Sequence, residues 1–124
     1  MSNTVSTPVN PLEERVAALN ALVATYHYRE AHAEFYAEHF VKHENEDAPT
    51  IGLEAHRAAT ETFLNSISNA TCTLLNTIVS DNMSVSEWHY RFDHAEWGHS
   101  DFKALSLQRW EDGKVGHERH CYSM

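Results

Sequence analysis

The chain has 124 residues, of which 42% are hydrophobic and 22% are charged, and its net charge is -9 at pH 7. This size and composition predict a globular protein with a hydrophobic core of its own. The negative charge argues against nucleic acid and anionic membranes as partners. Because no apolar run reaches the length of a membrane span and the first residues lack a signal-peptide pattern, we expect a cytoplasmic location.

The N-terminal part of the chain predicts helices. Residues 1–9 are expected to be a flexible lead-in, and residues 10–124 a single domain. Asn10 and Pro11 form a helix start, with an Asx N-cap and a proline at the first helical position. An apolar stripe at helical spacing follows, made by Leu12, Val16, Leu19, Val23 and Tyr26. Helical composition continues through residue 39, so one bent helix and two consecutive helices are both allowed.

Strand signals begin after this helical region. Phe40 and Val41 indicate a very short strand, and the acidic segment behind them indicates a loop that ends near Gly52. Residues 53–67 predict another helix, and residues 70–79 are a β-type run rich in Thr, Leu, Ile and Val. Cys72 and Cys121 form no CxxC motif and lie in strand-like runs, which favours buried free thiols.

Three alternating runs end the chain, at residues 85–94, 101–110 and 115–122. Short polar turns join them, which is typical of an antiparallel meander. If Asp112-Gly113 is a two-residue type I′ loop, Leu107 faces Glu118. The loop before residue 101 is expected to place Trp88 near Leu107. A bulged three-residue turn would shift this register by one and turn the last strand over.

The two-residue loop predicts one aromatic and aliphatic face with an acid and a histidine set into it. Its members are Trp88, Tyr90, Phe92, Leu105, Leu107, Glu118, His120 and Tyr122. The opposite, polar face holds Glu87, His89, Arg91, Ser106, Gln108, His117 and Arg119, together with Leu74, Asn76 and Ile78. Since helices must cover the apolar face, we predict an α+β fold in which a curved antiparallel sheet wraps around the helices as a cone, with a pocket at its open end.

The segments EWHYRF and ALSLQRWEDGKVGHERHCY resemble the closing hairpin of SnoaL-like proteins in the nuclear transport factor two-like superfamily, and ENEDAPTIGLEAHRA resembles the family's strand, loop and helix start. The resemblance spans roughly residues 11 to 123 and implies an α+β cone barrel (cystatin-like), often homodimeric, with an interior pocket. Members include polyketide cyclases, isomerases, dehydratases and binding proteins, so the fold does not fix the reaction. Ser123 stands where cyclase-like members usually carry an aspartate, which argues against cyclase chemistry.

Glu118 and His120 are the candidate catalytic residues. They lie two apart on a strand and therefore point the same way, and a carboxylate among aromatic residues with a histidine beside it suits acid–base chemistry on a hydrophobic carbonyl compound. The alternative interpretation is a buried Glu118 that is paired with Arg109 or His120, or bonded to Tyr90 or Trp88, for stability alone.

A small apolar or aromatic ligand is the expected partner of the pocket. The candidate ligand-binding residues are Trp88, Tyr90, Leu105, Leu107, Tyr36, His43, Tyr122 and Arg109. Despite ten histidines, no HExxH motif or Cys-His cluster has metal-ligand spacing, so we predict no metal and no cofactor. The polar face carries mixed charges and apolar patches, which suits a homodimer interface. A non-catalytic binding or interaction protein on the same fold is the second functional hypothesis.

Overall fold

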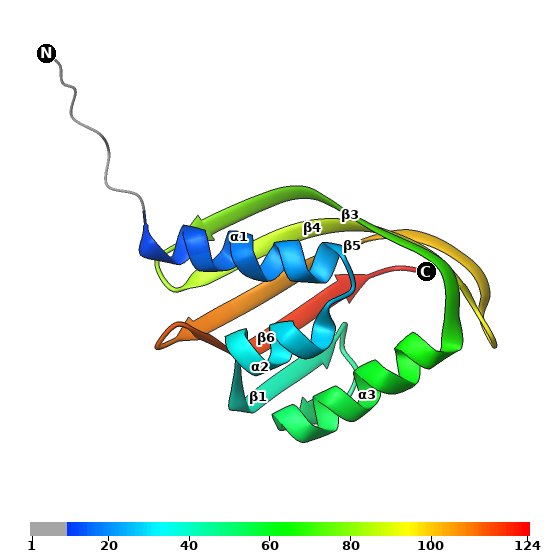
Figure 1. Ribbon diagram of the computed structural model, residues 1–124, viewed down its shortest axis with the longest axis horizontal. Helices are drawn as coiled ribbons and strands as arrows, with labels where there is room; N and C mark the ends of the chain where they lie inside the picture. Colours follow the sequence, from blue (N-terminus) through cyan, green and yellow to red (C-terminus); the bar gives the residue numbers. More distant parts are fainter. Residues whose placement is uncertain (1–9) are drawn as a thin grey trace, which may run out of the picture.

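The computed structural model describes residues 10–124, and the predicted lead-in at residues 1–9 lies outside them. Three helices lie on one side of a six-stranded sheet that is curved and not closed (Figure 1), which confirms the predicted α+β cone. The elements are α1 (Pro11–Ala24), α2 (Tyr28–Phe35), β1 (Tyr36–Glu44), β2 (Thr50–Ile51), α3 (Leu53–Ser66), β3 (Ile67–Ser80), β4 (Met83–His94), β5 (Gly98–Glu111) and β6 (Lys114–Tyr122).

The first helix begins and packs as its sequence dictates. The Asn10 side chain accepts a hydrogen bond from the Leu12 amide at 3.0 Å, and Pro11 follows at the first helical position. Val16, Leu19 and Val23 are buried in the core. Tyr26 has a φ of 60°, which breaks the helical path, so two helices and not one bent helix precede the sheet.

The helix predicted through residue 39 ends four residues earlier than expected, and β1 is correspondingly longer than the predicted short strand. Tyr36 and Phe40 are buried, with ring centroids 4.7 Å apart, so core packing overrides the helical composition here. The strand order is β2-β1-β6-β5-β4-β3. β1 pairs parallel with β6, whereas the other neighbouring strands are antiparallel, so the prediction of an antiparallel sheet misses one pair.

The register of the meander differs from the prediction in two places. Strand β5 begins at Gly98, three residues before its predicted start, and pairs Ala104 with Trp88, so β5 is turned over relative to the expected pairing of Leu107 with Trp88. At the Asp112-Gly113 turn both residues have positive φ, as the two-residue loop requires. A bulge between Arg109 and Trp110 then shifts the β5–β6 register by one residue.

Each of these register shifts is an odd number of residues, and an odd shift turns a strand over. The first shift turns β5 over relative to β4, and the second turns β6 over relative to β5, so β6 returns to its predicted orientation. Glu118, His120 and Tyr122 still lie on the face of Trp88, as predicted. Leu105, Leu107 and Arg109 are on the outer face, which corrects their predicted position, and Leu105 is 45% exposed. The inner positions of β5 are taken by Ser106 and Gln108, which were predicted on the polar face, and Leu74 pairs with Trp88 and is also on the inner face.

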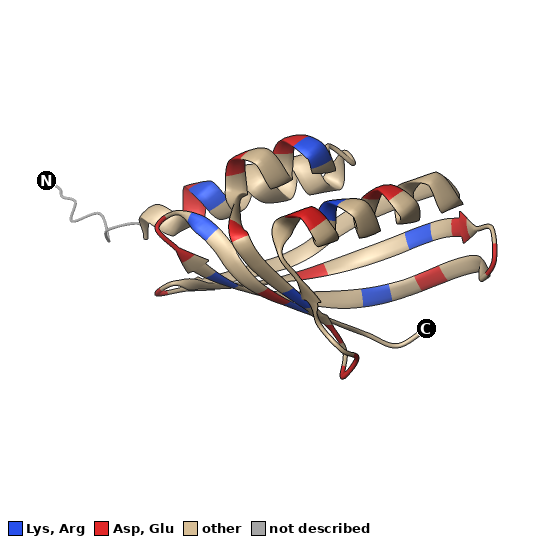
Figure 2. Cartoon of the chain, turned by 90° about the horizontal axis from the view of Figure 1, so that it is seen from below, with Lys and Arg blue, Asp and Glu red and all other residues tan. Residues whose placement is uncertain are grey.

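The helices cover the inner face of the sheet, while Asp and Glu residues mark many of the turns between strands (Figure 2). Cys72 and Cys121 are free; Cys121 is exposed on the outer face and not buried as predicted. No helix among the described residues is long and apolar enough to span a membrane.

Candidate functional site

A cavity of about 530 Å³ lies between α3 and the inner face of the sheet. Only Leu53 and His56 of α3 are buried, so the later turns of this helix stand over the cavity without filling it. Aromatic rings dominate one part of its wall, contributed by Phe63, Trp88, Phe92, Trp97 and Phe102. A second hollow of about 600 Å³ between α1 and β3 is an open groove, and Glu13 is the one titratable residue on its wall. The cavity under α3 is therefore the candidate site.

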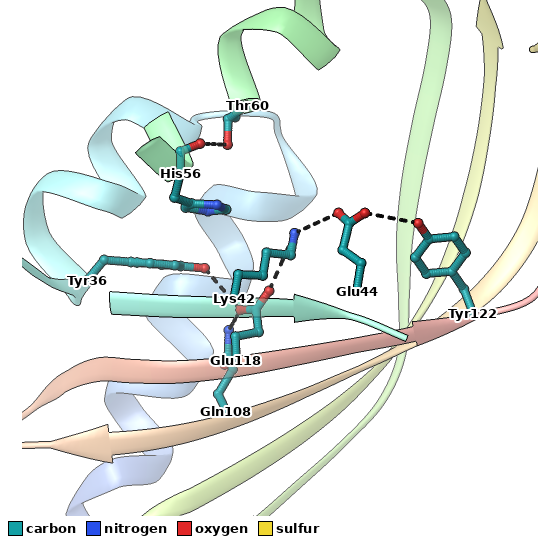
Figure 3. A network of polar contacts seen from close by, with 8 residues as sticks. All are labelled: Tyr36, Lys42, Glu44, His56, Thr60, Gln108, Glu118 and Tyr122. Atoms are coloured by element: carbon teal, nitrogen blue, oxygen red, sulfur yellow. Dashed lines mark hydrogen bonds and ion pairs between the residues drawn. The ribbon is translucent and has the colours of Figure 1, made fainter. Parts of the chain in front are cut away.

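Glu118 is the buried acid of this cavity, 5% exposed. Its Oε1 accepts hydrogen bonds from Gln108 Nε2 at 2.6 Å and from the Tyr36 hydroxyl at 3.3 Å. Lys42 Nζ lies 3.8 Å from its Oε2 (Figure 3). The partners foreseen from sequence, Arg109 among them, do not contact the carboxylate. One oxygen is thus held by neutral donors, and the other faces a single ammonium group.

Lys42 links this buried acid to the cavity mouth. The parallel pairing of β1 with β6 sets Lys42 opposite Glu118, and the ammonium group lies 3.6 Å from Glu44 Oε1. The Tyr122 hydroxyl donates to Glu44 Oε2 at 3.1 Å. Burial and the adjacent Glu44 charge raise the pKa of Tyr122 to about 12, so this phenol stays protonated and acts as a donor.

Two neutral imidazoles face the same cavity. His56 stacks on Tyr36 with ring centroids 5.7 Å apart, and His120 meets Tyr90 edge-on at 5.8 Å. Burial, followed by the Lys42 charge, lowers the pKa of His120 to about 3 and that of His56 to about 2. At physiological pH both rings therefore accept or donate hydrogen bonds without carrying charge.

The structure brings six of the predicted site residues to the cavity wall and leaves four away from it. Those on the wall are Glu118, His120, Trp88, Tyr90, Tyr36 and Tyr122. Leu105, Leu107 and Arg109 are absent from it because β5 is turned over, as described above. His43 is on the outer face because its neighbour Lys42 points inward; its ring lies 5.0 Å from that of His117.

Lys42, Gln108 and His56 are polar residues of the site that sequence reasoning did not single out. His56 lies in the helix predicted at residues 53–67, and nothing in the sequence distinguished it from a core histidine. Gln108 was assigned to the wrong face by the register. Lys42 could be placed at the site only from the full length of β1 and its parallel pairing with β6. The helical composition of residues 28–39 gave no sign of this strand.

The described residues contain no group of three or more His, Cys, Asp or Glu side chains that are placed to hold a metal ion. The chemistry available around Glu118 is that of its carboxylate, the Lys42 ammonium group, the two neutral imidazoles and several phenols, and the wall also holds Glu44, His94 and Glu96. Such groups bind and move protons at a ligand oxygen or at a carbon next to a carbonyl.

Comparison with known proteins gives one sequence match and several structural ones. The family model described as the SnoaL-like domain matches residues 15–117. A proposed SnoaL-like polyketide cyclase from Jannaschia sp. CCS1 superposes with a TM-score of 0.81 at 13% identity, over 95% of this chain and 92% of that one.

Two further structures have the same fold. A proposed SnoaL-like polyketide cyclase from Mesorhizobium loti gives a TM-score of 0.78 at 14% identity, covering 90% of this chain and 98% of the other. A nuclear transport factor two-like protein of unknown function from Cytophaga hutchinsonii gives 0.74 at 15% identity, covering 90% and 99%. No curated protein matches the sequence. At these identities, the structural likeness establishes the fold alone.

Proposed function

Because the chain belongs to the SnoaL-like domain family, we propose that its cavity binds a small, largely apolar or aromatic molecule and that Glu118 acts on it as an acid–base group. The observation that carries this proposal is the buried Glu118 carboxylate in an aromatic-lined cavity of about 530 Å³. A cavity of this size and lining suits a ligand of two or three fused rings.

The reaction class that fits is proton transfer at a hydrophobic carbonyl compound, as in an isomerase, a cyclase or a dehydratase. Glu118 would take the proton from the carbon next to the carbonyl, and the electron pair would move onto the carbonyl oxygen as the enolate forms. Protonated Glu118 would then return this proton to the ligand at its new position, while neutral His120, which lines the same cavity, would hold the ligand by a hydrogen bond.

Deuterium exchange tests this proposal without knowledge of the natural substrate. Acetylnaphthalene has exchangeable methyl protons next to its carbonyl and matches the cavity in character. In deuterated buffer the wild-type protein is expected to accelerate deuterium incorporation into that methyl group, measured by NMR. A bound ketone whose methyl protons exchange at the buffer rate would refute the catalytic part of the proposal.

A non-catalytic binding protein is the second candidate, and one observation favours it. Oε1 of Glu118 already has two protein donors, Gln108 and Tyr36, as expected for a group whose role is to complete a buried network. The exchange experiment separates the two functions, since this candidate predicts binding without acceleration.

We further propose a homodimer formed through the outer sheet face. The corrected register adds Leu105 to that face, and Ile78 is 67% exposed there, so apolar side chains lie among the charges of Arg91 and Arg119. Light scattering is expected to give twice the chain mass at neutral pH, and Leu105→Arg is expected to give a monomer.

Association through this face should also weaken on acidification. His117 lies near Arg109 and Arg119 on the outer face, and its protonation would place more positive charge on both partners. A mass that stays constant between about pH 8 and about pH 5 would contradict this pH effect. A monomer at every pH would refute the proposed dimer.

The cytoplasmic location stays a prediction, which cell fractionation would test.

A further inference from the structure

Three phenol side chains line the inner part of the cavity, and two of them have no assigned task. Tyr28 enters from the start of α2 and Tyr90 from the middle of β4. The third, Tyr36, donates its hydroxyl hydrogen to Glu118. The Tyr90 ring contacts Trp88 on one side, at 6.3 Å between centroids, and His120 on another. Tyr28 and Tyr90 are thus held by rigid elements around the buried acid.

Neither hydroxyl has a strong acceptor within residues 10–124. The Tyr28 hydroxyl makes no hydrogen bond to a described residue, and the Tyr90 hydroxyl has the Cys72 thiol beside it. A thiol is a weak partner for a phenol. A donor at the wall of an apolar cavity that lacks an acceptor costs free energy until a ligand supplies one.

Both phenols also remain donors at any physiological pH. Burial raises the pKa of Tyr28 and of Tyr90 well above the ordinary value, and the Glu118 charge raises both further. Tyr28, Tyr90 and Glu118 all line the same cavity. Neither phenol donates to the carboxylate, whose Oε1 accepts from Gln108 and Tyr36.

We infer that the hydroxyls of Tyr28 and Tyr90 together bind an oxygen acceptor of the ligand, a ketone or quinone carbonyl, and hold it beside Glu118. This rests on the proposed binding function and deepens it, because it states which ligand atom is recognised and by which residues. A hydrocarbon of the same shape would fill the same space but leave both donors unpaired. Discrimination by unpaired buried donors is stronger than discrimination by shape.

A matched pair of ligands tests this inference. Acetylnaphthalene carries the carbonyl acceptor, whereas ethylnaphthalene has nearly the same shape without it. Calorimetric titration of the wild-type protein is expected to show tighter binding of the ketone by about tenfold, since one to two hydrogen bonds are gained. Tyr28→Phe and Tyr90→Phe should each reduce this preference, and the double variant should abolish it.

The control variant is Tyr26→Phe. The Tyr26 ring lies 5.8 Å from that of Tyr28, and its buried hydroxyl has no partner among residues 10–124, but the residue is not on the cavity wall. Its ketone preference should equal that of the wild type. Unchanged ethylnaphthalene affinity in each variant shows that the cavity is still folded.

The outcomes separate this inference from the proposed function. If both naphthalenes bind equally well to the wild type, or if the double variant keeps the ketone preference, the role of the two phenols is refuted while the binding function stands. If neither naphthalene binds, the binding function itself is refuted, and the phenol role with it.

Discussion

Acidification from about pH 7 to about pH 5 is expected to lower the free energy of unfolding by several kcal/mol. The cause is a set of buried histidines that fold in the neutral state. His32 and His56 are 2% and 6% exposed, and their ring centroids are 4.7 Å apart. Burial is the largest cause of their shifts and lowers the pKa of His32 to about 4 and that of His56 to about 2.

The sign of the effect follows from proton binding. Above the unfolded-state pKa of about 6.5 neither state binds the proton, so nothing is lost. Below it the unfolded chain binds protons that the folded chain refuses, and each histidine then removes up to about 1.4 kcal/mol per pH unit until its folded pKa is reached. His120 shares this direction, because burial lowers its pKa to about 3. The carboxyls of Asp93 and Asp101, whose pKa values are lowered chiefly by hydrogen bonds, act only below about pH 4.

Denaturant unfolding at a series of pH values measures this slope. His32→Phe should reduce this slope by the contribution of about one proton. The variant keeps the ring contacts and removes a buried Nε2 that has no hydrogen-bond partner among the described residues. The matched control is Phe35→Leu, which alters a buried ring of the same helix that binds no proton and should leave the slope unchanged. A free energy of unfolding that is flat between about pH 6.5 and about pH 4.5 would contradict the burial of neutral histidines.

Glu118→Gln is expected to lower the rate of ketone deuterium exchange by roughly a hundred- to ten-thousand-fold, the range for removal of an acid–base group. The fold should survive this change. The new amide oxygen can still accept from Gln108 and Tyr36, and the amide group has nearly the size of the carboxylate. We expect the free energy of unfolding to change by less than about 1 kcal/mol.

Glu87→Gln is the matched control for this variant. Glu87 precedes Trp88 on β4 and points to the opposite face of the sheet, where it bonds Asn76. Its exchange rate should equal that of the wild type. A Glu118→Gln protein that exchanges deuterium normally would remove the catalytic assignment. A variant that loses several kcal/mol of stability would show instead that the carboxylate serves the fold.

The helices, the strand order of the meander and the inward direction of Glu118 could be predicted from local pattern. Alternation fixes which residues of one strand share a face, because neighbouring side chains point in opposite directions. It does not fix how two strands slide past each other. The expected pairing of Trp88 with Leu107 was wrong by three residues, and the bulge near Trp110 added one more. The position of β6 was predicted correctly only because these errors cancel.

The polar partners of Glu118 could not be predicted for a different reason. Lys42 reaches the carboxylate through a parallel pair between strands that lie far apart in the sequence, and no local signal encodes such a pair. Gln108 faces inward because β5 is turned over, and the bulge near Trp110 then sets it opposite Glu118. The predicted partners, Arg109 and His120, were inferred from proximity in sequence, and the sheet turns Arg109 to the outer face.

Ligand titration against a blocked cavity tests the central claim most directly. Ala59 is an exposed residue of α3 on the cavity wall, and its neighbour Ala58 is exposed but not on that wall. Acetylnaphthalene binding can be followed through the fluorescence of Trp88 and Trp97. Ala59→Trp is expected to weaken binding by at least about tenfold, while Ala58→Trp leaves it unchanged. Equal affinity for the wild type and Ala59→Trp would show that the ligand does not enter the space above Glu118.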